Sequence, residues 1–146
     1  MITEEQYVGK TCLFCVSDFH LEMILLPYIK EKMYNEDIII MTEKNLEESL
    51  NTLLTKINLK EEDKLKIKSL DWKNKNLLKH VMKGNDKILH IIVNGSVSYI
   101  KKINKIISEI KDRQIEVVNC FHIEEKDVDV SVLSQEYKKI LNTQKI

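Results

Sequence analysis

Several residue types that characterise particular protein classes are scarce in this 146-residue sequence. It has no alanine, one proline, three glycines and a single arginine, Arg113. Phosphate-binding loops of the GxxxxGK[ST] and GxGxxG kinds need clustered glycines, and neither pattern follows a predicted strand. Gly9 begins a Gly-Lys-Thr triplet, but this triplet precedes the first predicted strand and so belongs to the wrong edge of the sheet. The sequence therefore predicts no nucleotide cradle.

Charge of one sign is also lacking, since 23 basic side chains balance 23 acidic ones. Nucleic-acid binders usually carry a net basic face, and bidentate readout of phosphate or guanine favours arginine. We therefore expect no nucleic-acid partner. The sequence has no apolar run long enough for a transmembrane helix and no signal peptide, and its three cysteines form an odd set. These features predict a cytoplasmic protein with reduced thiols, and the abundance of Ile, Lys and Asn is typical of an AT-rich bacterial genome.

Short apolar runs alternate with helical patterns along the chain. Strands are predicted at residues 10–17, 37–42, 65–70, 88–93 and 115–123. Helices are predicted at residues 19–34, 45–57, 75–83, 96–113 and 131–141, with a kink or a division into two short helices at Pro27. Such alternation indicates βαβ units and a parallel sheet covered on both faces. We predict one α/β domain over residues 1–146, with three α/β/α layers and a five-stranded, mostly parallel sheet of Rossmann-like or RecA-like type.

Ligands of open α/β sheets bind beyond the carboxyl ends of the strands, so the residues that follow each strand are the candidate site. The predicted ligand-binding residues are Asp18, His20, Thr42, Glu43, Trp72, Asn94, Ser96 and His122. Lys44, Gly95, Glu124 and Glu125 fall at the same strand ends. Loops at this edge are commonly polar because they are solvated and cap helices, so polarity there does not by itself specify a function.

Metal and thiol chemistry have weaker sequence support. Cys12 and Cys15 have redox spacing but lie within a predicted strand, on opposite faces, which favours buried thiols. Cys120 and His122 share a face but lack a matched second pair of zinc ligands. We predict no metal and no cofactor. An alternative is a small Mg²⁺-dependent hydrolase or nuclease that uses Asp18, Glu43 and Asp71.

Four segments carry a resemblance to a known family. They are SDFHLEMILLPYIKEKM (17–33), EDIIIMTEKNLEESLNTLL (36–54), LKIKSLDW (65–72) and VVNCFHIEEKDVDVSVLSQEYKKIL (117–141). Their order resembles the MEDS sensory domains of methanogen and methylotroph regulators, which are similar to KaiC and RecA ATPases. Cys120 and His122 lie near the place of that family's Cys-x-Tyr motif.

The resemblance implies a RecA-like sheet without a working P-loop, in place of the strand order 3-2-1-4-5 that we otherwise expect. It also implies a sensory role. We predict a non-catalytic signal-transduction domain that binds a small ligand or a protein partner at the carboxyl edge of the sheet. A homodimer or a complex with a regulatory protein is expected, and a protein-interaction scaffold without a ligand is a further alternative.

Overall fold

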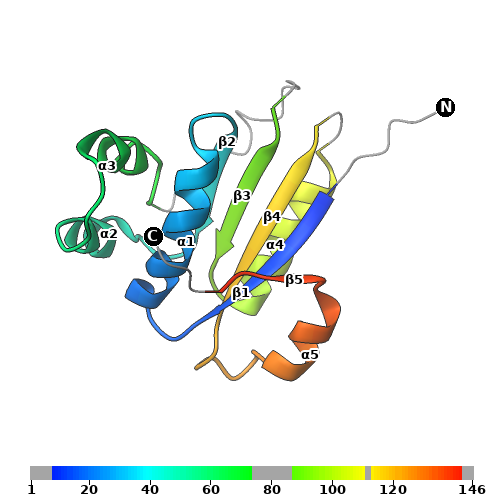
Figure 1. The fold of residues 1–146 in the computed structure, drawn as a ribbon. Helices are drawn as coiled ribbons and strands as arrows, with labels where there is room; N and C mark the ends of the chain where they lie inside the picture. The colour runs from blue at the N-terminus through cyan, green and yellow to red at the C-terminus, as the bar shows by residue number, and fades with distance from the viewer. Residues whose placement is uncertain (1–7, 74–86, 111–112, 143–146) are drawn as a thin grey trace.

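The computed structural model describes residues 8–73, 87–110 and 113–142 (Figure 1). In chain order its elements are β1 (Val8–Cys15), α1 (Asp18–Lys32), β2 (Asp37–Thr42), α2 (Glu47–Leu54), α3 (Glu61–Lys68), β3 (Leu89–Asn94), α4 (Val97–Ser108), β4 (Ile115–His122), α5 (Val130–Glu136) and β5 (Lys139–Ile140). The described residues confirm the predicted α/β class and the five-stranded sheet. None of the described helices has the length and apolar content that a membrane crossing requires.

The sheet is parallel throughout, with strand order β2-β3-β4-β1-β5. The expected order 3-2-1-4-5, which counts the strand predicted at 65–70, puts the first strand between those at 37–42 and 88–93. In the structure these two strands, β2 and β3, pair directly, and β1 lies on the far side of β4. All five strands run the same way, so their carboxyl ends meet at one edge, which is at the bottom of Figure 1. The register places Cys15 opposite His122, and Asn94 opposite both Thr42 and Cys120. This register determines which polar side chains meet at the candidate site.

Helices cover both faces of the sheet. On one face α1, α2 and α3 bury a cluster that includes Leu13, Ile92 and Val118, and on the other α4 packs over Ile91 and Val117. Cys15 and Cys120 belong to the first cluster and Cys12 to the second, because side chains of a strand alternate between faces. The prediction that Cys12 and Cys15 occupy opposite faces is therefore confirmed, and all three thiols are unpaired.

The strand predicted at residues 65–70 is wrong, because this segment belongs largely to the helix α3. Its Leu-Lys-Ile-Lys alternation is too short to separate a strand from a helix. Helical spacing puts Asp63 and Ile67 four residues apart on the buried side, while Leu65 is exposed. Three acidic residues in the first turn and two lysines in the last also complement the helix dipole. The fifth strand is instead β5. It lies within the range 131–141 that was predicted to be helical, where the helix α5 ends at Glu136.

Other helix boundaries also differ from the predictions. α1 is one helix through Pro27 rather than two, since its buried apolar face compensates for the single backbone donor that proline lacks. α2 has Leu46 at its N-cap, while Asn45 accepts a hydrogen bond from the Glu47 N–H. Ser96, the first residue of the helix predicted at 96–113, is the N-cap of α4, but α4 ends at Ser108. The helix predicted at 75–83 lies outside the described residues.

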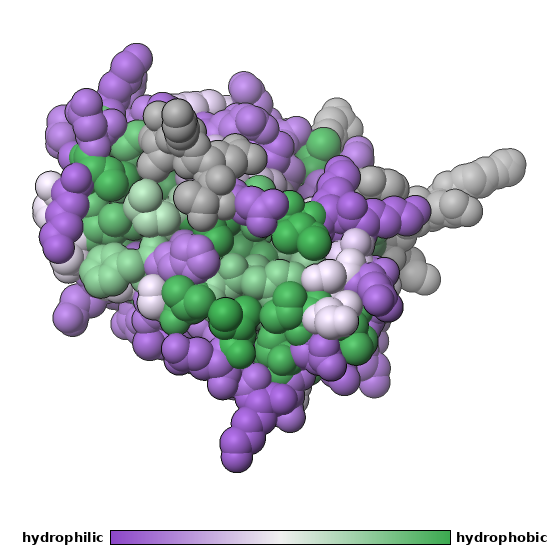
Figure 2. Space-filling view, turned by 60° about the horizontal axis from the view of Figure 1, so that its bottom comes forward, coloured by the Kyte–Doolittle hydropathy of each residue, from purple (hydrophilic) through white to green (hydrophobic). Residues whose placement is uncertain are grey.

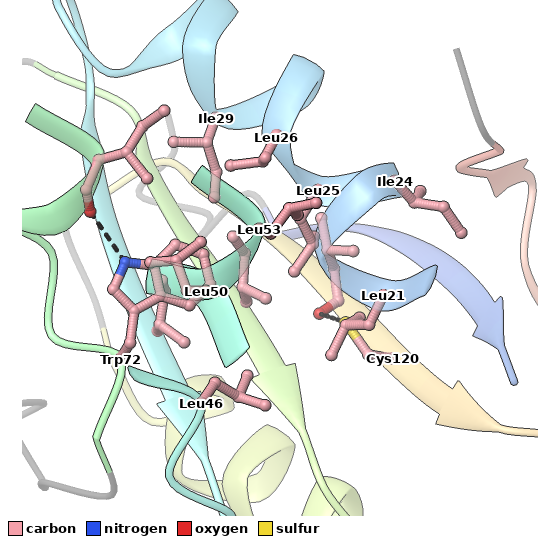
Figure 3. Close-up of a cluster of buried hydrophobic side chains, with 14 of the residues drawn as sticks. Leu21, Ile24, Leu25, Leu26, Ile29, Leu46, Leu50, Leu53, Trp72 and Cys120 are labelled. Carbon is pink, nitrogen blue, oxygen red and sulfur yellow. Dashed lines mark hydrogen bonds between the residues drawn. The ribbon is translucent and has the colours of Figure 1, made fainter. Parts of the chain in front are cut away.

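Trp72 lies in the core and not at the end of a strand, which corrects its predicted place. Figure 3 shows its ring beside Leu46 and Leu50, where its indole Nε1–H donates to the carbonyl of Ile67 at 2.8 Å. The side chain is 2% exposed. Its position follows from the helical state of α3, because the segment that precedes it does not lead to the sheet edge.

Candidate functional site

A cavity of about 390 Å³ opens at the carboxyl edge of the sheet. It is lined by Asp18, Glu43, Lys44, Asn94, Gly95, Ser96, His122, Glu124 and Glu125. These residues come from the first position of α1, from the last positions of β3 and β4, and from the loops after β2, β3 and β4. We call this cavity the carboxyl-edge pocket. Five of the eight predicted ligand-binding residues line it, and four more of its lining residues were placed at the same edge by the sequence.

The other three predicted residues do not line the pocket. Trp72 is in the core. His20 faces back along the chain. Its ring Nδ1 accepts the Val16 backbone N–H at 3.0 Å, and the His20 backbone N–H donates to Ser17 Oγ. Thr42 is buried beneath the pocket, where its hydroxyl group hydrogen-bonds to two lining residues, Asn94 and Lys44. His20 and Thr42 therefore organise the loops rather than face the cavity.

A chain of hydrogen bonds runs across the strand ends beneath the pocket. Cys15 Sγ lies 3.4 Å from His122 Nδ1, and His122 Nε2 lies 2.8 Å from Asn94 Oδ1. Asn94 Nδ2 then donates to Thr42 Oγ1 at 3.1 Å, and the Thr42 hydroxyl donates to the carbonyl of Lys44 at 2.6 Å. Four strands and one loop are thus joined by polar side chains.

The last bond of this chain determines the direction of the others. A carbonyl only accepts, so the Thr42 hydroxyl gives its proton to Lys44 and must accept from the Asn94 amide nitrogen. The Asn94 oxygen then faces His122 and accepts from Nε2–H. The remaining ring nitrogen of neutral His122, Nδ1, carries the lone pair and faces the Cys15 thiol. The network therefore selects one histidine tautomer.

The order Cys15, His122, Asn94 has the polarity of a nucleophile, a base and a group that orients the base. The thiol, however, is fully buried. Burial, followed by the nearby carboxylates of Asp18 and Glu125, raises the pKa of Cys15 to about 12. Reactive cysteines instead need a lowered pKa and access to solvent. In this arrangement Cys15 is a hydrogen-bond donor that holds His122.

The pocket has an acidic rim with two internal contacts. Lys44 Nζ pairs with Asp18 Oδ2 at 2.6 Å, and Glu43 Oε1 accepts the Ser96 backbone N–H at 2.9 Å. A helix N-terminus attracts anions, so the Glu43 carboxylate already occupies the place where α4 would bind one. Gly95 makes this approach possible, because a Cβ there would lie 2.8 Å from Glu43 Oε1.

The metal-dependent alternative finds less support in this geometry. Asp71 follows a helix, does not line the pocket, and accepts the Lys73 backbone N–H at 3.0 Å. Within the described residues, no group of three or more His, Cys, Asp or Glu side chains is placed to hold a metal ion. Asp18 and Glu43 line the pocket, but the third carboxylate of the proposed set does not.

The sequence did not reveal the link between Cys15 and His122. Both positions end strands, but their pairing requires β4 to lie next to β1, and a strand order is not visible in a hydrophobic pattern. The odd spacing of Cys15 from Cys12 puts the two thiols on opposite faces, but it does not say which of them shares a face with Cys120 and His122.

No protein-family model matches the chain, and neither does any curated protein or solved structure.

Proposed function

We propose that the protein is a non-catalytic sensory domain that binds a small polar ligand in the carboxyl-edge pocket. The observation that carries the proposal is the polar network below the pocket. Asn94 is 2% exposed, and its side-chain oxygen and nitrogen bond to His122 and Thr42. Such satisfied networks hold side chains in one arrangement, which is what recognition of a particular ligand needs.

Charge supports a neutral or cationic ligand over a nucleotide. Four carboxylates line the pocket, and Lys44 is paired with one of them, Asp18. The α4 N-terminus, where a phosphate would bind, holds Glu43 instead. A sensory role without nucleotide hydrolysis is also what the MEDS resemblance implies.

A protein-interaction scaffold is the second candidate, and one observation favours it. Val16, Phe19 and Ile123 follow β1 and β4 and are each 42% to 50% exposed. Figure 2 brings the carboxyl edge forward and shows apolar side chains gathered on this face, with polar ones around them. Exposed apolar patches commonly mark protein contacts. We also propose that the protein is cytoplasmic and bacterial, and that it signals as a homodimer or through a regulatory partner. The free thiols agree with a reducing compartment.

A thermal-shift screen tests the sensory proposal. The library should contain matched neutral, cationic and anionic small molecules, and Mg²⁺ and Mn²⁺ at millimolar concentration should be included. A ligand of the folded state raises the melting temperature. We expect neutral or cationic hits whose affinity falls at least about tenfold in Asp18→Asn and Glu124→Gln. Glu109→Gln, an exposed change at the end of α4, is the matched control and should bind as the wild type does.

The outcomes separate the candidates. A metal-dependent shift that is lost in Asp18→Asn would favour the hydrolase. Absence of any small-molecule hit, with concentration-dependent association measured by sedimentation that Phe19→Ser abolishes, would favour the scaffold. Hits that bind equally well to all three carboxamide variants would contradict the pocket as the ligand site.

A further inference from the structure

A second and larger cavity, of about 540 Å³, lies on the face of the sheet that α1 covers. It is lined by Thr11, Tyr28, Lys32, Glu36, Ile88, His90, Glu116, Lys139, Ile140 and Leu141. His90 and Glu116 come from the second position of β3 and of β4, so this cavity is near the amino ends of the strands. It shares no lining residue with the carboxyl-edge pocket. We call it the amino-edge cavity.

A hydrogen-bonded relay centred on the buried His90 forms one side of this cavity. Tyr28 Oη lies 2.7 Å from His90 Nδ1, and His90 Nε2 lies 2.5 Å from Glu36 Oε1. An ionised carboxylate only accepts, so Nε2–H of a neutral His90 donates to Glu36 and Nδ1 accepts the Tyr28 hydroxyl proton. The phenolic proton is then committed to His90. The free lone pairs of Tyr28 Oη remain as hydrogen-bond acceptors.

Glu116 adds a carboxylate that has no hydrogen-bond or ion-pair partner among the described residues. It lies against Gly9, where an added Cβ would be 2.6 Å from Oε1 and 2.8 Å from Oε2. The glycine of the Gly-Lys-Thr triplet therefore makes room for Glu116. Burial raises the pKa of Tyr28, and the nearby carboxylates of Glu116 and Glu36 add to this shift.

The two lysines at the cavity do not neutralise this charge at close range. Lys32 Nζ pairs with Glu31 Oε1 at 3.1 Å and lies 5.1 Å from the centroid of the Tyr28 ring. Lys139 is exposed on the edge strand β5. The remaining wall is apolar, with Ile88, Ile140 and Leu141. The cavity thus combines acceptors of hydrogen bonds with an apolar wall.

We propose that the amino-edge cavity binds a small organic ammonium ion, with its charged head at Glu116 and Tyr28 and its apolar body against Ile88, Ile140 and Leu141. An ammonium group offers three donors, which the Glu116 carboxylate and the Tyr28 oxygen can accept. A carboxylate or phosphate ligand would have Lys32 and Lys139 as cationic partners, but it would lie beside the like charges of Glu116 and Glu36. This site is independent of the carboxyl-edge pocket and of its ligand.

Calorimetric titration of the full chain with n-hexylamine tests this inference, with n-hexanol and hexanoate as probes of the same apolar body. We expect hexylamine to bind, and both controls to bind at least about tenfold more weakly. Glu116→Gln keeps the shape of the side chain and removes its charge, so it should weaken hexylamine binding by about tenfold or more. Glu124→Gln, its counterpart at the carboxyl-edge pocket, should bind hexylamine as the wild type does.

Two further variants test the geometry. Tyr28→Phe keeps the ring and removes the acceptor oxygen, so hexylamine binding should weaken. Gly9→Ala should displace the Glu116 carboxylate and weaken binding too, while both variants retain the far-UV circular dichroism of the wild type. Equal binding of hexylamine and hexanol, unchanged binding in Glu116→Gln, or loss of binding in Glu124→Gln alone would each overturn the proposal. Loss in Glu124→Gln alone would place hexylamine in the carboxyl-edge pocket instead. The other results leave that pocket to its own test, the thermal-shift screen.

Discussion

His122 Nε2 lies 2.8 Å from Asn94 Oδ1, and this contact joins β4 to β3 at the edge where the pocket opens. This contact predicts which ring nitrogen of His122 carries the proton. The hydrogen-bond directions that begin at the Lys44 carbonyl place the proton of neutral His122 on Nε2 and leave Nδ1 facing Cys15. Nitrogen-15 NMR of the neutral imidazole should show this tautomer. Detection of the Nδ1–H tautomer would contradict the network.

Removing the amide tests the same network through stability. Asn94→Ala removes one of the two donors to the buried Thr42 oxygen, leaves His122 without its acceptor, and creates a small cavity. We expect a loss of about 2 to 4 kcal/mol in the free energy of unfolding. Urea unfolding measures it. Asn104→Ala is the comparison variant. It removes the same kind of side chain on the opposite face of the sheet, where Asn104 bonds to Asn119 outside this network.

The three thiols should be inert in the folded protein. Cys12, Cys15 and Cys120 are fully buried, and burial raises the pKa of each. A thiolate is the reactive form, so a disulfide reagent such as DTNB should label no cysteine under native conditions near neutral pH and all three after unfolding. Rapid labelling of Cys15 in the native protein would instead make the Cys15-His122-Asn94 arrangement a nucleophilic site.

Glu22 gives the stability a pH dependence. Its side chain is fully buried between α1 and α2, Oε2 accepts from Ser49, and Oε1 has no partner among the described residues. Burial is the main cause that raises its pKa from 4.5 to about 7. Below pH 4.5 both the folded and the unfolded chain hold this proton. Between pH 4.5 and 7 only the folded chain retains it, so the Glu22 contribution to stability decreases as pH rises and is constant above that range.

Glu22→Gln should therefore stabilise the protein at pH 8 by about 1 to 3 kcal/mol, and the difference should disappear near pH 4. Urea unfolding across this pH range, followed by Trp72 fluorescence, measures the effect. Glu109→Gln is exposed and should follow the wild type at every pH. A stability difference that is equal at pH 4 and pH 8 would contradict the assignment of a buried, protonated carboxyl.

Trp72 should behave as a core residue. Trp72→Phe removes the bond from Nε1–H to the Ile67 carbonyl and part of the buried ring, so it should cost about 1 to 3 kcal/mol of stability. The emission of native Trp72 should be at short wavelength and resist quenching by acrylamide. Ready quenching in the folded state would place Trp72 at the surface, where the sequence had predicted it.

Trp72 also shows where sequence reasoning fails. The alternation of apolar and charged residues at 65–70 fits a six-residue strand. The segment instead belongs largely to the helix α3, and only the packing of Ile67 and Trp72 in the core shows this. By contrast, β3 and β4 were predictable within one residue, because their apolar runs are buried on both faces. β5 has two residues and no pattern of its own.

The candidate site was partly predictable for a related reason. Parallel strands bring their carboxyl ends together in any order, so Asp18, Glu43 and His122 converge whichever strands are neighbours. The contacts between particular residues were not predictable. They require β4 between β1 and β3, and that order depends on how the helices pack over the whole sheet.

The central claim is that the carboxyl-edge pocket binds a small polar ligand. Amide chemical-shift mapping tests it most directly, with the best neutral or cationic hit of the thermal-shift screen titrated into labelled protein. We predict saturable shifts at Gly95, Ser96, Lys44 and Glu124, which are reduced in Asp18→Asn and retained in Glu109→Gln. Shifts confined to other surfaces, or none at saturating ligand, would contradict the claim.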